Sequence, residues 1–193
     1  MPFPEKPPLI VLVGPTGVGK TELSLHLAER LDGEIVSADS RLFYRGMDIG
    51  TAKPTEAERA RVPHHLIDTT SPAEPWTLAV FQRAAYAAIA DIHLRGRLPF
   101  LVGGTGQYVS AVVEGWTIPA QQPDPRLRAA LDRWADDVGP KALHARLARV
   151  DPEAAARIDP RNVRRTVRAL EVVFRTGRKF SEQRQRGPVP FAA

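Results

Sequence analysis

Short apolar runs alternate with amphipathic stretches along the first 115 residues of the chain. The run LIVLV (9–13) is continuous and rich in β-branched residues, a pattern typical of a strand buried on both faces of a parallel sheet. EIVSAD (34–39) and LPFLV (98–102) repeat this pattern, and HHLIDTTSP (64–72) is a candidate for a shorter strand. Each run predicts one strand of a common sheet.

Helical periodicity fills the segments between these runs. Leucines recur at intervals of four in residues 20–31, and apolar residues at positions 78, 81, 85, 89 and 92 follow the spacing of an amphipathic helix. Gly96 is placed to end that helix, and Gly106–Glu114 has a helical pattern too. Strand and helix therefore alternate, which predicts an α/β fold, a doubly wound parallel sheet flanked by helices.

The pattern changes at GWTIPAQQPDPR (115–126), where three prolines mark a boundary. Beyond it we find no convincing strand, and the spacing predicts helices at about 126–137, 140–149, 152–158 and 161–176. We therefore expect two domains, an α/β core over residues 1–115 and an all-helical lobe over residues 116–193.

Charge is distributed unevenly between these two parts. Residues 1–115 contain 11 Lys and Arg against 13 Asp and Glu, whereas residues 116–193 contain 16 against 9. The helical lobe thus holds the basic surplus, which predicts a polyanionic partner there. The absence of cysteine excludes disulfides and thiolate zinc sites. Leu9–Val13 is too short for a signal peptide or a membrane span, so we expect a cytoplasmic protein with no membrane partner.

The last predicted helix, in RNVRRTVRALEVVFRTG (161–177), is strongly two-sided. At 100° per residue one arc holds apolar side chains and the other holds arginines; the apolar set is Val163, Val167, Leu170 and Phe174, and the cationic set is Arg161, Arg164, Arg165, Arg168 and Arg175. Such a face is often only solvated. Between residues 157 and 186, however, ten Lys and Arg face three Asp and Glu, which favours contact with a nucleic-acid backbone.

GPTGVGKT (14–21) fits the pattern G-x-x-x-x-G-K-[ST] and directly follows a predicted strand. Its glycines let backbone N–H groups converge on phosphate oxygens, Lys20 would neutralise terminal phosphates, and Thr21 would ligate Mg²⁺. The motif predicts a di- or triphosphate with Mg²⁺ and does not identify the molecule. The alternative is a plain glycine turn with an exposed lysine.

Two further polar residues fall where predicted strands end. Asp39 follows the second strand, and Thr105 lies in the turn VGGTG (102–106) after the last one. Ligands of open α/β sheets bind at this carboxyl edge, so Asp39 is a candidate general base or an indirect partner of Mg²⁺. A solvated carboxylate or a helix cap is an equally good interpretation of Asp39. Asp68 is a weaker candidate for the Mg²⁺ role.

The chain resembles the tRNA dimethylallyltransferase family in five segments: GPTGVGKTELSLHLA, IVSADSRLFYRGMDIGTAKPT, HHLID, LVGGTGQY and RALEVVFRTGR. The match runs from about Leu9 to Arg178. The resemblance implies a P-loop core whose helical insertion grips the anticodon stem-loop of tRNA. It also implies transfer of a dimethylallyl group from dimethylallyl diphosphate to the exocyclic amine of the adenosine adjacent to the anticodon. We expect a monomer.

The family's functional residues match positions in this chain. The resemblance places the diphosphate, with Mg²⁺ on Thr21, on the phosphate loop: Gly14, Pro15, Thr16, Gly17, Val18, Gly19, Lys20 and Thr21. It implies that Asp39 is the base that takes the amine proton and that Thr105 touches tRNA at the reaction centre. The residues implied to contact tRNA are Asp39, Ser40, Arg41, Leu42, Thr105, Arg128, Arg164, Arg165, Thr166, Val167 and Arg168.

The family continues well beyond the equivalent of Ala193. We therefore expect a core that lacks a C-terminal part, and a chain that binds diphosphate weakly and turns over slowly or not at all. Two other functions fit the same motifs. One is a small-molecule kinase that uses the phosphate loop for ATP, and the other is a tRNA-binding fragment without activity.

Overall fold

The computed structural model describes residues 6–15, 17–74, 76–118, 124–183 and 187–192. The chain forms two compact units: unit 1 comprises Met1–Trp116 and Arg186–Ala193, and unit 2 comprises Thr117–Gln185. No helix among the described residues combines the length and the apolar character that crossing a bilayer requires.

Unit 1 is built on a parallel sheet of four strands in the order β1-β4-β2-β3. The strands are β1 Ile10–Val13, β2 Gly33–Ser37, β3 His64–His65 and β4 Leu98–Gly103; the helices are α1 Lys20–Arg30, α2 Glu56–Arg61, α3 Leu78–Leu94 and α4 Gly106–Val113. The predicted α/β fold is confirmed, because every apolar run forms a strand and all pairings are parallel.

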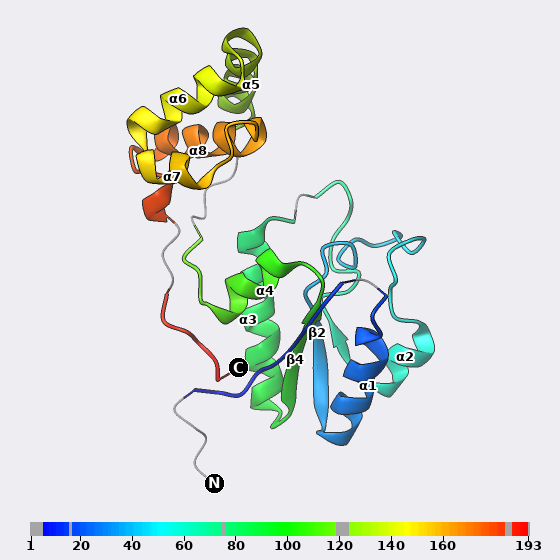
Figure 1. Ribbon diagram of the computed structural model, residues 1–193. Coiled ribbons are helices and arrows are strands. Elements are labelled where there is room, and N and C mark those ends of the chain that lie inside the picture. Colours follow the sequence, from blue (N-terminus) through cyan, green and yellow to red (C-terminus); the bar gives the residue numbers. More distant parts are fainter. Residues whose placement is uncertain (1–5, 16, 75, 119–123, 184–186, 193) are drawn as a thin grey trace. The chain divides into compact units, whose positions relative to one another are not determined.

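Helices cover both faces of this sheet, with α1 and α2 on one side and α3 and α4 on the other (Figure 1). Side chains alternate between the faces along each strand. Val36 and Leu101 accordingly pack in the cluster formed with α3 and α4, while Ile35 and Phe100 pack against α1. Strands buried on both faces need continuous apolar runs, which explains the sequence pattern.

Helix α2 was not predicted, although its start signal is present. Thr55 caps the helix by accepting from the Glu58 backbone N–H, and the Glu58 carboxylate accepts from the Thr55 N–H in return. This reciprocal pair is a capping box, a recognised start of a helix. None of the residues of α2 is buried, so no apolar periodicity accompanied the signal.

Unit 2 is helical among its described residues, as expected. Its helices are α5 Pro125–Val138, α6 Pro140–Val150, α7 Pro152–Arg157 and α8 Val163–Thr176, followed by a short 3₁₀ helix at Ser181–Gln183. Leu143, Leu147 and Leu170 lie at the centre of its core. One detail differs from the predicted apolar arc of the last helix: Phe174 is 52% exposed and does not belong to that core.

A buried carboxylate ties α5 to α8. Glu171 is fully buried and accepts from the Asp124 backbone N–H at 2.9 Å, from Arg128 at 2.5 Å and from Arg168 at 2.8 Å. Burial alone would raise the pKa of Glu171, but these hydrogen bonds outweigh it, and the pKa lies below its ordinary value. Glu171 is therefore charged and paired in the folded unit.

The end of the described chain lies in unit 1, whereas the sequence analysis placed residues 116–193 together in the lobe. The Leu9 N–H donates to the Ala192 carbonyl, and the Ala192 N–H donates to the Pro7 carbonyl, each at 3.0 Å. Phe191 is buried in the core of unit 1, where its ring contacts Tyr86. This apolar anchor and the backbone pairing explain the difference.

Gly103 is expected to be irreplaceable, because a Cβ atom there would lie 2.4 Å from the carbonyl of Ala38. Gly103→Ala should lower the free energy of unfolding by about 1–3 kcal/mol, as overpacking against backbone does. The matched control is Gly106→Ala, where nothing lies within 4 Å. Urea unfolding compares the two, and equal midpoints would contradict the close approach.

Glu171→Gln should lower the stability of unit 2 at neutral pH by about 1.5–3 kcal/mol, because hydrogen bonds between charged groups are lost. The folded-state pKa of Glu171 is below its unfolded value of 4.5, so the stabilisation is complete above that pH and is lost as the pH falls through the folded pKa. Urea unfolding followed by circular dichroism measures this. If the difference in free energy of unfolding between the native chain and Glu171→Gln stayed constant from about pH 7 to about pH 3, Glu171 would not be an ion-paired carboxylate in the folded state.

Candidate active site and nucleic-acid interface

Three loops meet at the carboxyl edge of the sheet in unit 1. They follow β1, β2 and β4, and parallel pairing brings the ends of these strands to one side. The Gly104 Cα approaches the Gly14 carbonyl so closely that a Cβ would lie 3.4 Å from it. Between the loops lies a cavity of about 350 Å³, lined by Pro15, Asp39, Ser40, Arg41, Gly50, Thr51, Ala52, Gly104 and Thr105.

Asp39 is held at this edge by the extension of β2. The Ala38 N–H donates to the Val102 carbonyl at 2.8 Å, which continues the pairing of β2 with β4. The Oδ1 atom of Asp39 accepts from the Arg41 N–H at 3.0 Å, forming a local turn. Within the described part of the chain, Oδ2 accepts no hydrogen bond. Asp39 thus has one oxygen that fixes its orientation and one that can take a proton.

Thr105 lies in the same cavity wall as Asp39. It precedes α4, yet its side chain does not cap that helix. Its Oγ1 instead accepts from the Ser40 backbone N–H at 3.4 Å, which links the loop after β4 to the loop after β2. Because the hydroxyl is the acceptor in this contact, its hydrogen is available for another group in the cavity.

The phosphate loop has the backbone conformation that its glycines predict. Gly17 and Gly19 adopt left-handed φ angles of 86° and 81°. Helix α1 begins at Lys20 with no side-chain cap on Gly19, so the dipole of the helix N-terminus faces the loop. The Lys20 ammonium folds back over the loop and donates to the Pro15 carbonyl at 2.6 Å. Thr16 lies outside the described residues.

Thr21 is exposed in the first turn of α1. The described residues contain no group of three His, Asp or Glu that could hold a metal ion. A hydroxyl with phosphate oxygens and water is nevertheless a usual ligand set for Mg²⁺ in phosphate-binding loops. The residues present therefore fit an Mg²⁺ ion that arrives with a diphosphate.

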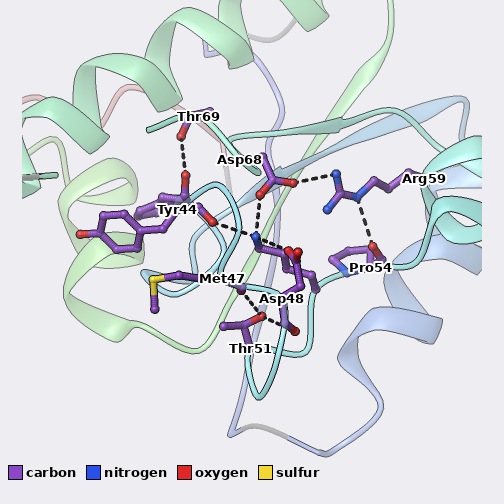
Figure 2. A network of polar contacts seen from close by, with 10 residues as sticks. Tyr44, Met47, Asp48, Thr51, Pro54, Arg59, Asp68 and Thr69 are labelled. Atoms are coloured by element: carbon purple, nitrogen blue, oxygen red, sulfur yellow. Dashed lines mark hydrogen bonds and ion pairs between the residues drawn. The ribbon is translucent and has the colours of Figure 1, made fainter. Parts of the chain in front are cut away.

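A polar network fastens the loop between β2 and α2 (Figure 2). The Lys53 ammonium donates to the Tyr44 carbonyl at 2.8 Å, to Asp48 at 2.8 Å and to Asp68 at 2.6 Å. Arg59 donates to the second oxygen of Asp68 at 3.0 Å. The hydrogen bonds from Lys53 and then Arg59 hold the pKa of Asp68 below its ordinary value. Asp68 is thus committed to ion pairs, which argues against the Mg²⁺ role considered for it.

Sequence reasoning missed this network and the cavity wall formed by residues 50–52. The contacts join positions that are far apart in the sequence and show no periodicity, and two of the residues involved, Ala52 and Asp68, adopt positive φ angles without being glycine. The high density of glycine and polar residues in 40–55 is the available signal, and it is typical of a loop without specifying the contacts that the loop makes.

The four arginines of unit 2 that are expected to contact tRNA fall into two groups. Arg128 and Arg168 share the buried carboxylate of Glu171. Arg164 and Arg165, in the first turn of α8, are exposed and form no ion pair with any described residue. Their guanidinium groups are available to a polyanion.

Arg161 precedes α8 and pairs with Asp159 at 2.9 Å. Hydrogen bonds that Arg161 donates, first from its side chain and then from its backbone N–H, lower the pKa of Asp159 to about 2. The pair is exposed, and it neutralises one of the arginines in the predicted cationic arc.

Thr166 and Val167 require a correction. Both were expected to contact tRNA, but Thr166 is fully buried and Val167 is 2% exposed. The Thr166 hydroxyl donates to the Asn162 carbonyl at 3.1 Å, and Val167 packs in the core of unit 2. Their side chains support α8 from the inside and offer no surface to a nucleic acid.

Leu42, in unit 1, was also expected to contact tRNA. It is half-buried, and its carbonyl accepts from the Asp68 N–H.

Curated relatives match the chain over nearly its whole length. The tRNA dimethylallyltransferase of Roseiflexus sp. (strain RS-1) is 63% identical over 184 residues, which cover 95% of this chain and 60% of that protein. The tRNA dimethylallyltransferase of Chloroflexus aggregans is 60% identical over 183 residues, covering 95% of this chain and 62% of that protein. The chain thus spans about 60% of the length of these relatives.

Solved structures agree with these relatives. The tRNA isopentenylpyrophosphate transferase of Bacillus halodurans is 51% identical, with a TM-score of 0.59 over 89% of this chain and 57% of that chain. A eukaryotic dimethylallyltransferase acting on tRNA is 30% identical, with a TM-score of 0.78 over 96% of this chain and 46% of that chain. A family model described as IPP transferase matches residues 42–192. The chain therefore belongs to the IPP transferase family.

Proposed function

We propose that this chain carries a site for the transfer of a dimethylallyl group from dimethylallyl diphosphate to the exocyclic amine of the adenosine adjacent to the anticodon in tRNA, with the slow turnover that the sequence predicts. The observation that carries the proposal is the shared cavity of Asp39 and Thr105 beside the phosphate loop. This cavity places the Asp39 carboxylate, which can take a proton, beside a loop suited to binding phosphates. The names of the relatives support this choice of donor and acceptor.

The donor would lie with its diphosphate on residues 14–21. The Lys20 ammonium and the backbone N–H groups of the loop oppose the negative charge that develops as the diphosphate departs. Mg²⁺ held by Thr21 and the diphosphate would supply further charge stabilisation. Lys20 must leave its contact with the Pro15 carbonyl to do this, which exchanges a neutral acceptor for a charged one.

The acceptor needs a base, because the lone pair of an adenine amine is delocalised into the ring. In the proposed step the amine nitrogen forms a bond to the allylic carbon, the carbon–oxygen bond to diphosphate breaks, and the amine proton passes to Asp39. The unpartnered Oδ2 is suited to accept it. The Thr105 hydroxyl, which lies in the same cavity wall as Asp39, would orient the adenine of the acceptor.

Unit 2 would bind the anticodon stem-loop through its basic surface. Arg164 and Arg165 are exposed cations in the first turn of α8, while Glu171 fixes the direction of Arg128 and Arg168. Phosphate contacts of this kind supply affinity rather than sequence discrimination. The monomeric state and the cytoplasmic location stay predictions.

Asp39→Asn should slow prenyl transfer by about 10²–10⁴-fold, the usual contribution of a positioned general base. Asparagine keeps the acceptor for the Arg41 N–H, so donor binding should not change. The control is Asp32→Asn, an exposed carboxylate just before β2, at the opposite end of that strand from Asp39. The assay is single-turnover transfer from radiolabelled dimethylallyl diphosphate to an anticodon stem-loop.

The same assay distinguishes the alternatives. Unchanged transfer by Asp39→Asn would overturn the assignment of the base. Phosphate transfer when labelled ATP replaces the prenyl donor would favour a kinase. Binding of the stem-loop without transfer of either group would leave an RNA-binding fragment.

Arg165→Ala should weaken stem-loop binding and reduce the slope of log K against log salt concentration by about 1, the value for one lost phosphate contact. Arg157→Ala is the control, since Arg157 is exposed in the same unit but lies on α7 and pairs with Glu153. Fluorescence anisotropy titrations at several salt concentrations measure both. If the two variants gave the same slope, Arg165 would not lie at the RNA backbone.

A further inference from the structure

Two large apolar side chains beside the cavity are exposed to solvent. Ile49 is 100% exposed and Met47 is 42% exposed. The next three residues, Gly50, Thr51 and Ala52, line the cavity that contains Asp39. The apolar pair therefore lies on the rim of the site, on the loop that forms one of its walls.

Polar contacts hold this loop, and they leave the side chains of Met47 and Ile49 exposed. The Lys53 side chain is only 5% exposed and holds Tyr44, Asp48 and Asp68 together (Figure 2). The Thr51 hydroxyl donates back to the Met47 carbonyl at 2.8 Å. These contacts are polar and involve the backbone of Met47 but not its side chain, so the exposed apolar side chains take no part in holding the loop.

The backbone of this loop passes through several left-handed conformations. Gly46 and Gly50 adopt φ angles of 75° and 74°, and Ala52 adopts 52°, a conformation that side chains disfavour. The loop thus contains a strained residue, Ala52, and exposes an isoleucine fully to solvent, which are two departures from local preference. Such violations are expected where a segment serves a ligand.

The surroundings of the tip indicate the chemistry of that ligand. Arg41 and Arg45 are exposed in the same loop, and Asp48 is neutralised by Lys53. An apolar tip flanked by cations suits a nucleic acid, whose bases offer flat apolar faces and whose backbone is anionic. Proteins commonly insert isoleucine or methionine between bases to disrupt their stacking.

We propose that Met47 and Ile49 form an apolar wedge that packs against the nucleobases flanking the target adenosine and so holds that adenosine out of the stack, in reach of Asp39. The inference rests on the proposed function, because an enzyme that modifies a base must first expose it. The wedge would replace the stacking contacts that the neighbouring bases lose.

The test separates binding, base exposure and chemistry. An anticodon stem-loop carries 2-aminopurine at the target position, and its fluorescence rises when that base leaves the stack. Anisotropy of an end label measures binding independently. The test variant is Met47→Ser with Ile49→Ser, and the control is Leu94→Ser, an 87% exposed leucine at the end of α3. A second variant, Met47→Leu with Ile49→Leu, keeps the wedge apolar.

The native chain, the leucine variant and the Leu94→Ser control should raise the 2-aminopurine fluorescence on binding. The serine variant should bind but lose most of that rise, and its single-turnover transfer to the unmodified stem-loop should slow by about tenfold or more. A stem-loop with abasic sites on both sides of the target should restore transfer by the serine variant, since no stack remains to be opened.

A serine variant that keeps both the fluorescence rise and the transfer rate would overturn the wedge. So would binding of the native chain without any rise. Neither result touches the proposed function, which the transfer assay with Asp39→Asn decides on its own. A rise that depends on Met47 and Ile49, with no transfer by the native chain, would support the wedge and contradict the transferase activity.

Discussion

The site of unit 1 depends on one constraint, the insertion of β4 between β1 and β2 in a fully parallel sheet. This order brings the ends of three strands to one edge, and it demands that the chain leaving β4 pass very close to both neighbours. Gly103 lies against the backbone of Ala38, and Gly104 lies near the carbonyl of Gly14. A side chain on Gly103 would push the strands apart, and Thr105 would no longer reach the Ser40 N–H. The glycines of the last turn therefore determine the distance between the phosphate loop and the carboxylate.

The ion pairs near the cavity join Lys53 and Arg59 to other carboxylates, and none among the described residues involves Asp39. A buried cation is unstable without partners, and Lys53 obtains them from Asp48, Asp68 and a carbonyl. Arg59 takes the other oxygen of Asp68. Among the described residues that line the cavity, Asp39 is the one carboxylate, and it is held only through the Arg41 N–H. The network thus stiffens the wall without competing for the proton acceptor.

The sequence predicted the features that follow from local periodicity and from the direction of strands. Apolar runs gave the strands, and the carboxyl-edge rule placed Asp39 and Thr105 together. Long-range pairing was out of reach: nothing in the spacing of Lys53 and Asp68 indicates their ion pair. Burial within an amphipathic helix was predicted only in part. Val167 and Leu170 lie in the core as expected, whereas Phe174 is exposed because α8 ends at Thr176 and its last turn extends past that core.

Unit 2 illustrates why a count of arginines overstates a binding surface. Glu171 neutralises part of the charge of Arg128 and Arg168, and Asp159 does the same for Arg161. Paired guanidinium groups are still useful, because a carboxylate that occupies some of their donors leaves the others pointing in a fixed direction. Arg164 and Arg165 keep their full charge but also their side-chain freedom, which must be lost on contact with phosphate. The surface therefore combines pre-oriented donors of reduced charge with mobile donors of full charge. Under the proposed function the first kind would favour a particular RNA shape, and the second would attract any polyanion.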